Sequence, residues 1–203
     1  MISIYKIKPK FQKALKPLLH LLHNLGITPN SITISSILFS FILSYFFYNA
    51  QEISFYYLIV ALGLLFRMML NALDGMMAKK YSLQSSLGEV LNEIGDVISD
   101  IAIYFPLILF SSLRIELAIL FVVLSVLNEF CGILAKVISG ERRYDGPMGK
   151  SDRAFLIGVI CLCLYFNFAV DIYLDYIIGS ANLLIIVSSF IRITKSINYE
   201  KIN

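Results

Sequence analysis

Polar side chains at helical spacing are concentrated between residues 71 and 100, where the flanking segments are almost wholly apolar. Asn71, Asp74 and Ala78 recur at intervals of three and four residues, so they share one face of a helix. A second series recurs every fourth residue, and its members are Gly88, Asn92, Asp96 and Asp100. A short polar turn would bring the two helix faces together. Carboxylates and carboxamides that converge beside residues without bulk predict a site for a hard divalent cation and a phosphate-bearing ligand.

The composition indicates that this site belongs to a membrane protein. Of 203 residues, 58% are hydrophobic and 15% are charged, whereas soluble domains are about 45–50% apolar and about 25% charged. We therefore expect an all-α integral membrane protein. Crossing the hydrocarbon core takes about 20 helical residues. Six transmembrane helices are predicted, at 31–50, 54–79, 84–110, 115–138, 153–170 and 173–194.

Residues 1–28 are expected to form an amphipathic helix in the membrane interface. The lysines between Lys6 and Lys16 make this stretch too charged to span a membrane. A helix of this kind is attracted to anionic lipid, and Pro17 is expected to kink or interrupt it. The apolar residues that step by three or four along it are Ile7, Phe11, Leu15, Leu18 and Leu22.

Positive charge is distributed unequally between the predicted connections. Those at 49–54, 111–116 and 170–175 contain only Arg114 as a cation, and nearly all other cations lie in the remaining connections and at the termini. Both termini and the polar stretch are therefore expected to face the cytoplasm of a bacterial-type inner membrane. We expect one domain over 1–203, with a six-helix bundle at 31–194 and a cytoplasmic tail at 195–203. No internal repeat is visible, which disfavours a transporter.

The polar stretch is similar to the signature of the CDP-alcohol phosphotransferase family, D-x-x-D-G-x-x-A-R-x8-G-x3-D-x3-D. The spacing matches from Asn71 to Asp96, and Pro29-Asn30-x-Ile32-Thr33 also resembles that family. So long a motif of fixed spacing is more specific than a short one. An alternative shifts the motif by one turn, to Asp96 and Asp100, but it would put Asn92 where the family has glycine.

The resemblance implies a transferase of phospholipid synthesis. An alcohol hydroxyl would attack the phosphorus next to the lipid in a CDP-lipid, expected to be CDP-diacylglycerol, and CMP would leave. In the family, four aspartates hold two divalent cations, Mg²⁺ or Mn²⁺, and the last aspartate also acts as the base. We expect one or two such ions, a homodimer, membrane lipids around the bundle and no nucleic-acid partner.

Matched position by position, the resemblance assigns the metal ligands to Asn71, Asp74, Asn92 and Asp96, with Asp96 also the catalytic base. It assigns donor binding to Pro29, Asn30, Thr33, Gly75, Ala78, Lys79, Ser85 and Gly88. The small residues among them could equally serve helix packing.

Three positions depart from the family pattern. Asn71 and Asn92 stand where the first and third aspartates should be, and Lys79 stands where the family has arginine. Asparagine offers a neutral carbonyl oxygen, a weaker ligand than a carboxylate. The formal charge of the four ligands therefore falls from four negatives to two.

Several nearby residues could compensate or support the ligands. Glu89 or Glu93 could supply an oxygen, and Glu129 is an ionisable residue in the middle of a span. Alternatively the site holds one cation and a fixed positive group, such as Arg67, replaces the other. Arg67 could instead simply pair with Glu129. Asp100 is expected to orient the ligands on the preceding turns.

The loop at 141–153 contains Gly, Pro and four cations, which predicts a turn that attracts anions. Its end, Lys150-Ser-Asp-Arg153, resembles the segment that family members using phosphorylated polyols place against the acceptor phosphate. An anionic polyol phosphate is thus the expected acceptor, serine remains open, and an ordinary loop against lipid headgroups is the alternative. The predicted acceptor-binding residues are Lys136, Arg142, Lys150, Arg153 and Arg192.

Two classes of function remain open. The first is a metal-dependent phospholipid synthase. The second is a catalytically impaired relative that binds a CDP-lipid or a partner lipid enzyme, which the two asparagines favour. Retention of five motif residues at full spacing favours the enzyme, and these are Asp74, Gly75, Ala78, Gly88 and Asp96.

Overall fold

The structure is a computed structural model that describes residues 8–200, with side chains described from 11 to 198. The described part of the chain is helical and contains no β-strand. Two short 3-10 helices, η2 (Phe105–Leu109) and η3 (Asp171–Tyr173), interrupt the longer elements. The α-helices are α1 (Lys8–Asn24), α2 (Pro29–Tyr48), α3 (Phe55–Lys80), α4 (Ser86–Tyr104), α5 (Ile115–Ser139), α6 (Lys150–Tyr165) and α7 (Leu174–Glu200).

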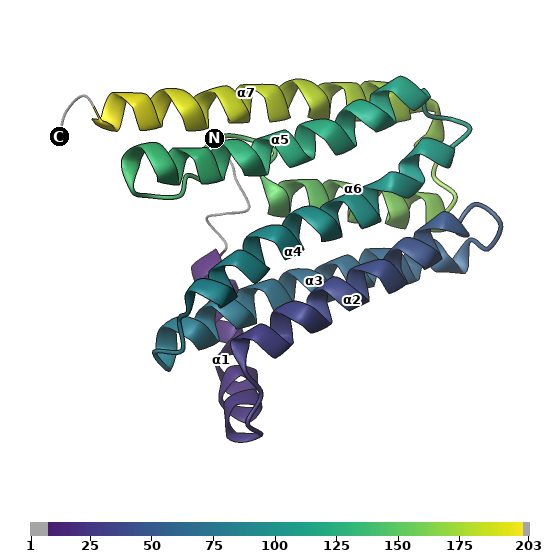
Figure 1. Cartoon of the computed structure of the whole chain (residues 1–203). Helices are drawn as coiled ribbons and strands as arrows, with labels where there is room; N and C mark the ends of the chain where they lie inside the picture. Colours follow the sequence, from purple (N-terminus) through teal and green to yellow (C-terminus); the bar gives the residue numbers. More distant parts are fainter. Residues whose placement is uncertain (1–7, 201–203) are drawn as a thin grey trace.

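The long helices form a layered bundle (Figure 1). One layer contains α2, α3 and α4, in which α2 packs against both neighbours. The opposite layer contains α5 and α7, which pack along each other, and α6 lies between the layers against α3. α1 contacts α3 and lies across the end of the bundle. The loops α3–α4 and α5–α6 both lie at this same end (Figure 1).

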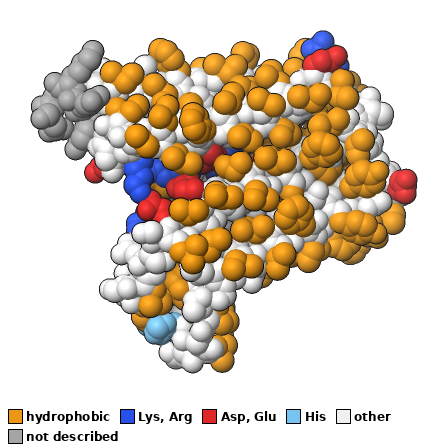
Figure 2. All heavy atoms as spheres, viewed as in Figure 1, with side chains coloured by type: hydrophobic (Ala, Val, Ile, Leu, Met, Phe, Trp, Pro, Cys, Tyr) orange, Lys and Arg blue, Asp and Glu red, His pale blue; other side chains and the backbone are white. Residues whose placement is uncertain are grey.

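Four helical segments are long and apolar enough to cross a membrane, namely α2, α3, α5 and the stretch Asp171–Asn198. This agrees with an integral membrane protein, and apolar side chains cover most of the visible surface (Figure 2). The predicted count of six spans is not confirmed. α4 and α6 occupy the expected places, but α4 carries four carboxylates and α6 has only 16 residues.

The helix boundaries follow local capping chemistry. Thr28 caps α2 by accepting a hydrogen bond from the Ser31 N–H at 3.2 Å, and Pro29 occupies the first turn. Ser85 caps α4 in the same way, and Gly140 ends α5 in the left-handed conformation, with φ 75°. Local sequence therefore sets where α2 and α4 begin and where α5 ends.

Some predicted boundaries differ from the helices observed. The interfacial helix is described from Lys8 to Asn24 and Pro17 does not interrupt it, while residues 1–7 lie outside the described residues. The tail predicted from 195 begins inside α7, which continues to Glu200, and 201–203 again lie outside the described residues.

The core has an apolar half and a polar half. A large apolar cluster fills the end of the bundle far from α1, and a smaller one attaches α1 to α2 and α3 through Leu15, Leu19, Leu73 and Met77. Buried charged and amide side chains lie between the large apolar cluster and the α1 end of the bundle. They are Arg67, Asp74, Asp96, Asp100, Asn128, Glu129, Arg153 and Arg192.

Candidate active site

A cavity of about 1090 Å³ opens at the end of the bundle near α1. Figure 2 shows charged side chains gathered in a hollow between the two layers at this end. Helices α1 to α5 and the α5–α6 loop all contribute to its walls. The predicted site residues that line it are Pro29, Asn30, Thr33, Asn71, Asp74, Gly75, Ala78, Lys79, Ser85, Gly88, Glu89, Asn92, Glu93, Lys136 and Arg142.

Asp74 joins the two predicted helix faces. Its side chain is buried in α3, with 3% of the residue exposed. The Oδ2 atom accepts hydrogen bonds from Thr33 Oγ1 at 2.9 Å and from Asn92 Nδ2 at 3.3 Å. The Oδ1 atom accepts from the Gly75 N–H at 2.6 Å. The convergence of the polar faces of α3 and α4 is therefore confirmed.

The two asparagines that replace aspartates are engaged with neighbours. Asn71 Oδ1 accepts a hydrogen bond from Ser36 Oγ at 2.8 Å. Asn92 presents its amide nitrogen, rather than its oxygen, to Asp74. An aspartate at position 92 would have no hydrogen to donate and would repel the Asp74 carboxylate unless a cation lay between them.

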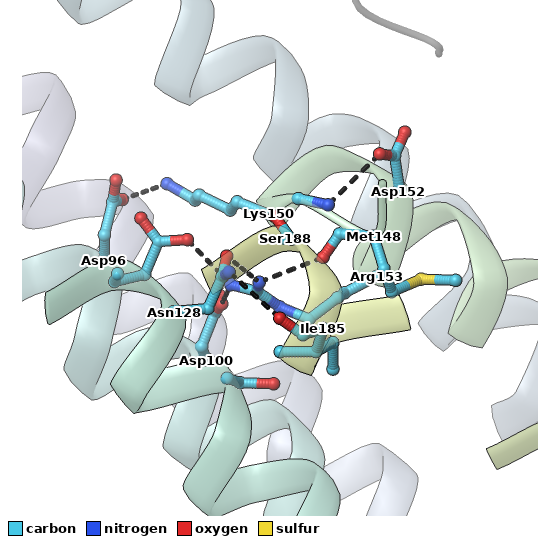
Figure 3. Close-up of polar contacts among 12 residues, drawn as sticks. Asp96, Asp100, Asn128, Met148, Lys150, Asp152, Arg153, Ile185 and Ser188 are labelled. Carbon is cyan, nitrogen blue, oxygen red and sulfur yellow. Dashed lines mark hydrogen bonds and ion pairs between the residues drawn. The ribbon is translucent and has the colours of Figure 1, made fainter. Parts of the chain in front are cut away.

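Asp96 forms an ion pair with Lys150, the first residue of α6 (Figure 3). The two side chains are largely shielded, with 12% of Asp96 and 21% of Lys150 exposed. Neither is among the described residues that line the cavity. The predicted catalytic base therefore lies beside the cavity with an ammonium group on its carboxylate.

Below this pair, charged groups form a buried network. Arg153 binds Asp100 and Glu129, each at 2.9 Å (Figure 3), and Arg67 binds Asp100 at 3.1 Å. Arg67 pairs with Asp100 instead of Glu129, and no contact between Arg67 and Glu129 is found among the described ion pairs. Asp100 accepts from two arginines, and no bond to the ligands on the preceding turns was found among its described contacts.

Arg142 closes the network toward the cavity. It binds Glu93 at 2.7 Å and Glu129 at 2.8 Å, and its guanidinium lies 4.8 Å from the centre of the Tyr144 ring. Burial disfavours the charged guanidinium, but Tyr144 and the two carboxylates outweigh that effect and hold the pKa of Arg142 above its usual range. Arg142 is therefore a permanent positive charge in the cavity wall.

Three of the predicted acceptor-binding cations meet at Glu129, which Arg142 binds at 2.8 Å, Arg153 at 2.9 Å and Arg192 at 3.9 Å. Lys136 and Arg142 line the cavity, and Lys136 pairs with Glu89. Arg192 donates to the backbone oxygens of Asn128 at 2.5 Å and Asp145 at 3.3 Å. Arg192, like Arg153, is almost fully buried, and neither is among the described residues that line the cavity.

The glutamates predicted to compensate for the missing carboxylates are paired with cations in the described contacts. Glu89 binds Lys136 and Glu129 binds arginines. Glu93 binds Arg142 through Oε1, while its Oε2 is buried without a hydrogen-bond partner in the described part of the chain. Sequence spacing identified these side chains as candidates but could not assign their partners, because each partner comes from another helix.

The small residues of the motif divide into two kinds. A Cβ atom at Gly88 would lie 2.8 Å from Asn30 Oδ1, so Gly88 permits close packing of α4 on the start of α2. A Cβ atom at Gly75 would meet nothing within 4 Å, and Gly75 lines the cavity. Gly75 is therefore not required for helix packing and leaves space open for a ligand.

Several residues at the site were not predicted. Ser36 binds Asn71, Asn128 binds Arg153 at 3.2 Å, and Tyr144 lines the cavity beside Arg142. Ser36 lies one turn after Thr33 on the same face of α2, and that spacing could have identified it. Two further cavity residues, Gln12 and Lys16, come from the interfacial helix.

The residues present fit a hard divalent cation held by few protein ligands. No group of three or more His, Cys, Asp or Glu side chains in the described part of the chain could hold a metal ion. Two carboxylates, Asp74 and Asp96, interact electrostatically with each other, and Asn71 adds a carbonyl oxygen nearby. Mg²⁺ commonly binds through one or two carboxylates together with water and substrate phosphates.

Comparison with known proteins identifies the family. The CDP-alcohol phosphatidyltransferase profile matches residues 26–192. Inner membrane protein YnbA of Escherichia coli (strain K12) is 39% identical over 197 residues, which cover 97% of this chain and 94% of that protein. The archaetidylinositol phosphate synthase of Pyrococcus horikoshii is 29% identical over 157 residues, covering 77% and 81% of the two chains.

Two solved structures of a phosphatidylinositol phosphate synthase from Mycobacterium tuberculosis share the fold. The form with CDP-DAG bound has a TM-score of 0.72 and 19% identity, and covers 89% of this chain and 92% of that chain. The form in complex with manganese and citrate has a TM-score of 0.73 and 21% identity, with coverages of 89% and 87%. The chain belongs to the CDP-alcohol phosphatidyltransferase family.

Proposed function

We propose that this chain moves a phosphatidyl group from a CDP-diacylglycerol type of donor to a hydroxyl of a small polar acceptor, with release of CMP. The observation that carries the proposal is the meeting of α3 and α4 at Asp74, at the end of an apolar bundle. Asp96 lies beside the cavity there, and the motif residues that line it are Asn71, Asp74, Gly75, Ala78, Lys79, Gly88 and Asn92. The M. tuberculosis relative with CDP-DAG bound supports the donor class.

In the proposed reaction, the acceptor oxygen forms a bond to the phosphorus next to the lipid while the bond from that phosphorus to the CMP oxygen breaks. Asp96 accepts the proton of the attacking hydroxyl. A Mg²⁺ or Mn²⁺ ion, held by Asp74 and Asp96 with oxygens of Asn71 and Asn92, would neutralise the diphosphate and the leaving CMP. Thr33 and the Gly75 N–H fix the orientation of the Asp74 carboxylate.

The proposed donor pocket uses the wall made by α2, α3 and α4. Asn30 packs against Gly88 beside the cap of α4, and Lys79 supplies a positive charge near the cavity mouth. Gly75 and Ala78 leave room for the phosphates and ribose. The donor residues proposed are Pro29, Asn30, Thr33, Gly75, Ala78, Lys79, Ser85 and Gly88.

The proposed acceptor is an anionic polyol phosphate bound at the α4–α5 side of the cavity. Lys136 is the cation there that can change partners most readily, because its pair with Glu89 is exposed. Arg142 is held between the partly buried Glu93 and the buried Glu129, so it acts on an acceptor mainly through its electric field. Arg153 and Arg192 would influence the acceptor indirectly, through their contacts with Glu129. Lys150 would do so through its ion pair with Asp96.

We further infer one membrane domain with α4 and α6 as the two remaining spans, which makes six. The arginines and lysines at the cavity end would place both termini and the cavity in the cytoplasm. An inner membrane location is supported by the E. coli relative. A homodimer is expected from the family resemblance, and light scattering of the purified protein would test it.

A direct assay tests the proposed reaction. Purified protein is given CDP-diacylglycerol, Mg²⁺ or Mn²⁺ and a panel containing glycerol phosphate, inositol phosphate and serine, and CMP is measured. CMP release that depends on one acceptor and disappears in Asp96→Asn is expected. The absence of three clustered metal-binding side chains among the described residues favours a second function, binding of the CDP-lipid without turnover. Donor binding without CMP release from any acceptor would establish that alternative.

A further inference from the structure

We propose that the Lys150 ammonium group supplies the second positive charge of this site, so that the site takes a single divalent cation. The inference rests on the proposed function, because it concerns how the same site balances the charge of a diphosphate donor. It replaces Arg67, which the sequence suggested for this role. Arg67 is held by Asp100, whereas Lys150 is bound to the motif residue Asp96 itself.

Lys150 is held in place by the start of α6. The Asp152 carboxylate accepts a hydrogen bond from the Gly149 N–H at 3.1 Å, which fixes the first turn of the helix. One turn further along α6, Arg153 binds Asp100, which lies one turn after Asp96 on α4 (Figure 3). Two ion pairs, Lys150 with Asp96 and Arg153 with Asp100, therefore connect successive turns of α6 and α4 through long side chains.

The charge of the motif residues favours one cation. Asp74 and Asp96 carry two negative charges, and Lys150 reduces the sum to one negative. One divalent cation would bring the empty site to one positive charge, and a second would bring it to three. Charges confined in a largely buried site are costly unless they are compensated. The carboxylates of Glu89, Glu93 and Glu129 are each paired with a lysine or an arginine, so they add little net negative charge to that sum.

Asn92, which stands at the third aspartate position of the motif, also favours a single cation. Asn92 donates an N–H to Asp74, so the edge that faces the carboxylate is positive rather than negative. The Lys150 charge also acts on Asp74. Each of the two carboxylates therefore has a nitrogen of this chain beside it, Asn92 Nδ2 at Asp74 and Lys150 Nζ at Asp96.

Counting bound Mn²⁺ on the full-length purified protein tests the inference. Loss of the free-ion electron paramagnetic resonance signal gives both stoichiometry and affinity. We expect one Mn²⁺ per chain for the natural sequence and for Lys150→Arg. Lys150→Met removes a like charge near the ion and should raise Mn²⁺ affinity by about tenfold or more. The triple variant Asn71→Asp, Asn92→Asp, Lys150→Met should bind two ions.

Lys195→Met is the matched control, because Lys195 forms a lysine–aspartate pair with Asp145 at 2.5 Å and does not line the cavity within the described residues. It should leave Mn²⁺ binding unchanged. Lys150→Arg keeps the charge, so the test stands even if Lys150→Met does not fold. Two ions, or none, bound to the natural protein would overturn the inference, as would equal Mn²⁺ affinity in the natural protein and a folded Lys150→Met.

The outcomes separate this inference from the proposed function. One bound ion together with no CMP release would contradict the transferase and retain the role of Lys150. Two bound ions together with CMP release would contradict the role of Lys150 and retain the transferase.

Discussion

Replacing Gly75 by alanine should stabilise the fold and weaken catalysis. Because the two effects have opposite directions, the substitution separates ligand binding from helix packing. Gly75 lies inside α3, and a Cβ atom there would meet nothing within 4 Å. Alanine in a helix interior is favoured over glycine by about 0.5–1 kcal/mol. A gain of that size in a chain of 203 residues should raise the melting temperature by about 1–4 °C.

The same methyl group should weaken catalysis. It would occupy cavity space next to Asp74, where the donor phosphates or ribose are proposed to lie. Forcing a methyl group into a filled site costs about 1–3 kcal/mol, which corresponds to a loss of about 5- to 150-fold in kcat/KM for the donor. Melting curves and CMP release over a range of CDP-diacylglycerol concentrations measure the two effects.

Gly179→Ala provides the matched control, because a Cβ atom at Gly179 in α7 also meets nothing within 4 Å and Gly179 does not line the cavity within the described residues. It should stabilise the protein similarly and leave CMP release unchanged. A lower melting temperature for Gly75→Ala would refute the open geometry at that position. Unchanged kinetics in Gly75→Ala would refute the proposal that a ligand fills the space.

Three further substitutions test the packing around the site. Gly88→Ala should cost less than about 1 kcal/mol of stability, because the new Cβ atom would lie 2.8 Å from Asn30 Oδ1, the end of a side chain that can turn away; a loss of about 3 kcal/mol in denaturant unfolding would contradict this. Arg153→Met should cost about 3–5 kcal/mol, since it leaves two buried carboxylates short of a partner, and denaturant unfolding would measure the loss. Thr33→Val removes a hydrogen bond to the Asp74 carboxylate and should cost about 1.5–3 kcal/mol in the same unfolding assay.

The sequence was sufficient to predict the order of the long helices and the faces of α3 and α4 that meet at the site. Intervals of three and four residues put Asn71 and Asp74 on one face of α3, and intervals of four put Asn92 and Asp96 on one face of α4. The hydrogen bond between Asn92 and Asp74 confirms that these faces meet. Periodicity succeeds here because it is a property of a single helix and requires no knowledge of packing.

The partners of the charged side chains could not be predicted in the same way. Lys150 and Asp96 are 54 positions apart, and Arg67 and Asp100 are 33 apart. Which of several arginines reaches which carboxylate depends on the distance and rotation between helices, and these are set by the packing of the whole bundle. The predicted count of six spans is not confirmed for a related reason. The four carboxylates of α4 lower its hydropathy, although cations from other parts of the chain pair with them.

The central claim is that this site transfers a phosphatidyl group, and mass spectrometry of the lipid product tests it most directly. Protein in lipid nanodiscs is incubated with CDP-diacylglycerol, Mn²⁺ and the acceptor panel, and CMP and lipid are measured in the same sample. The account predicts a phosphodiester lipid whose mass equals the phosphatidyl group joined to one acceptor, formed in equal amount with CMP and absent with Asp96→Asn. CDP-diacylglycerol that binds to the natural protein but is recovered intact with every acceptor would contradict it.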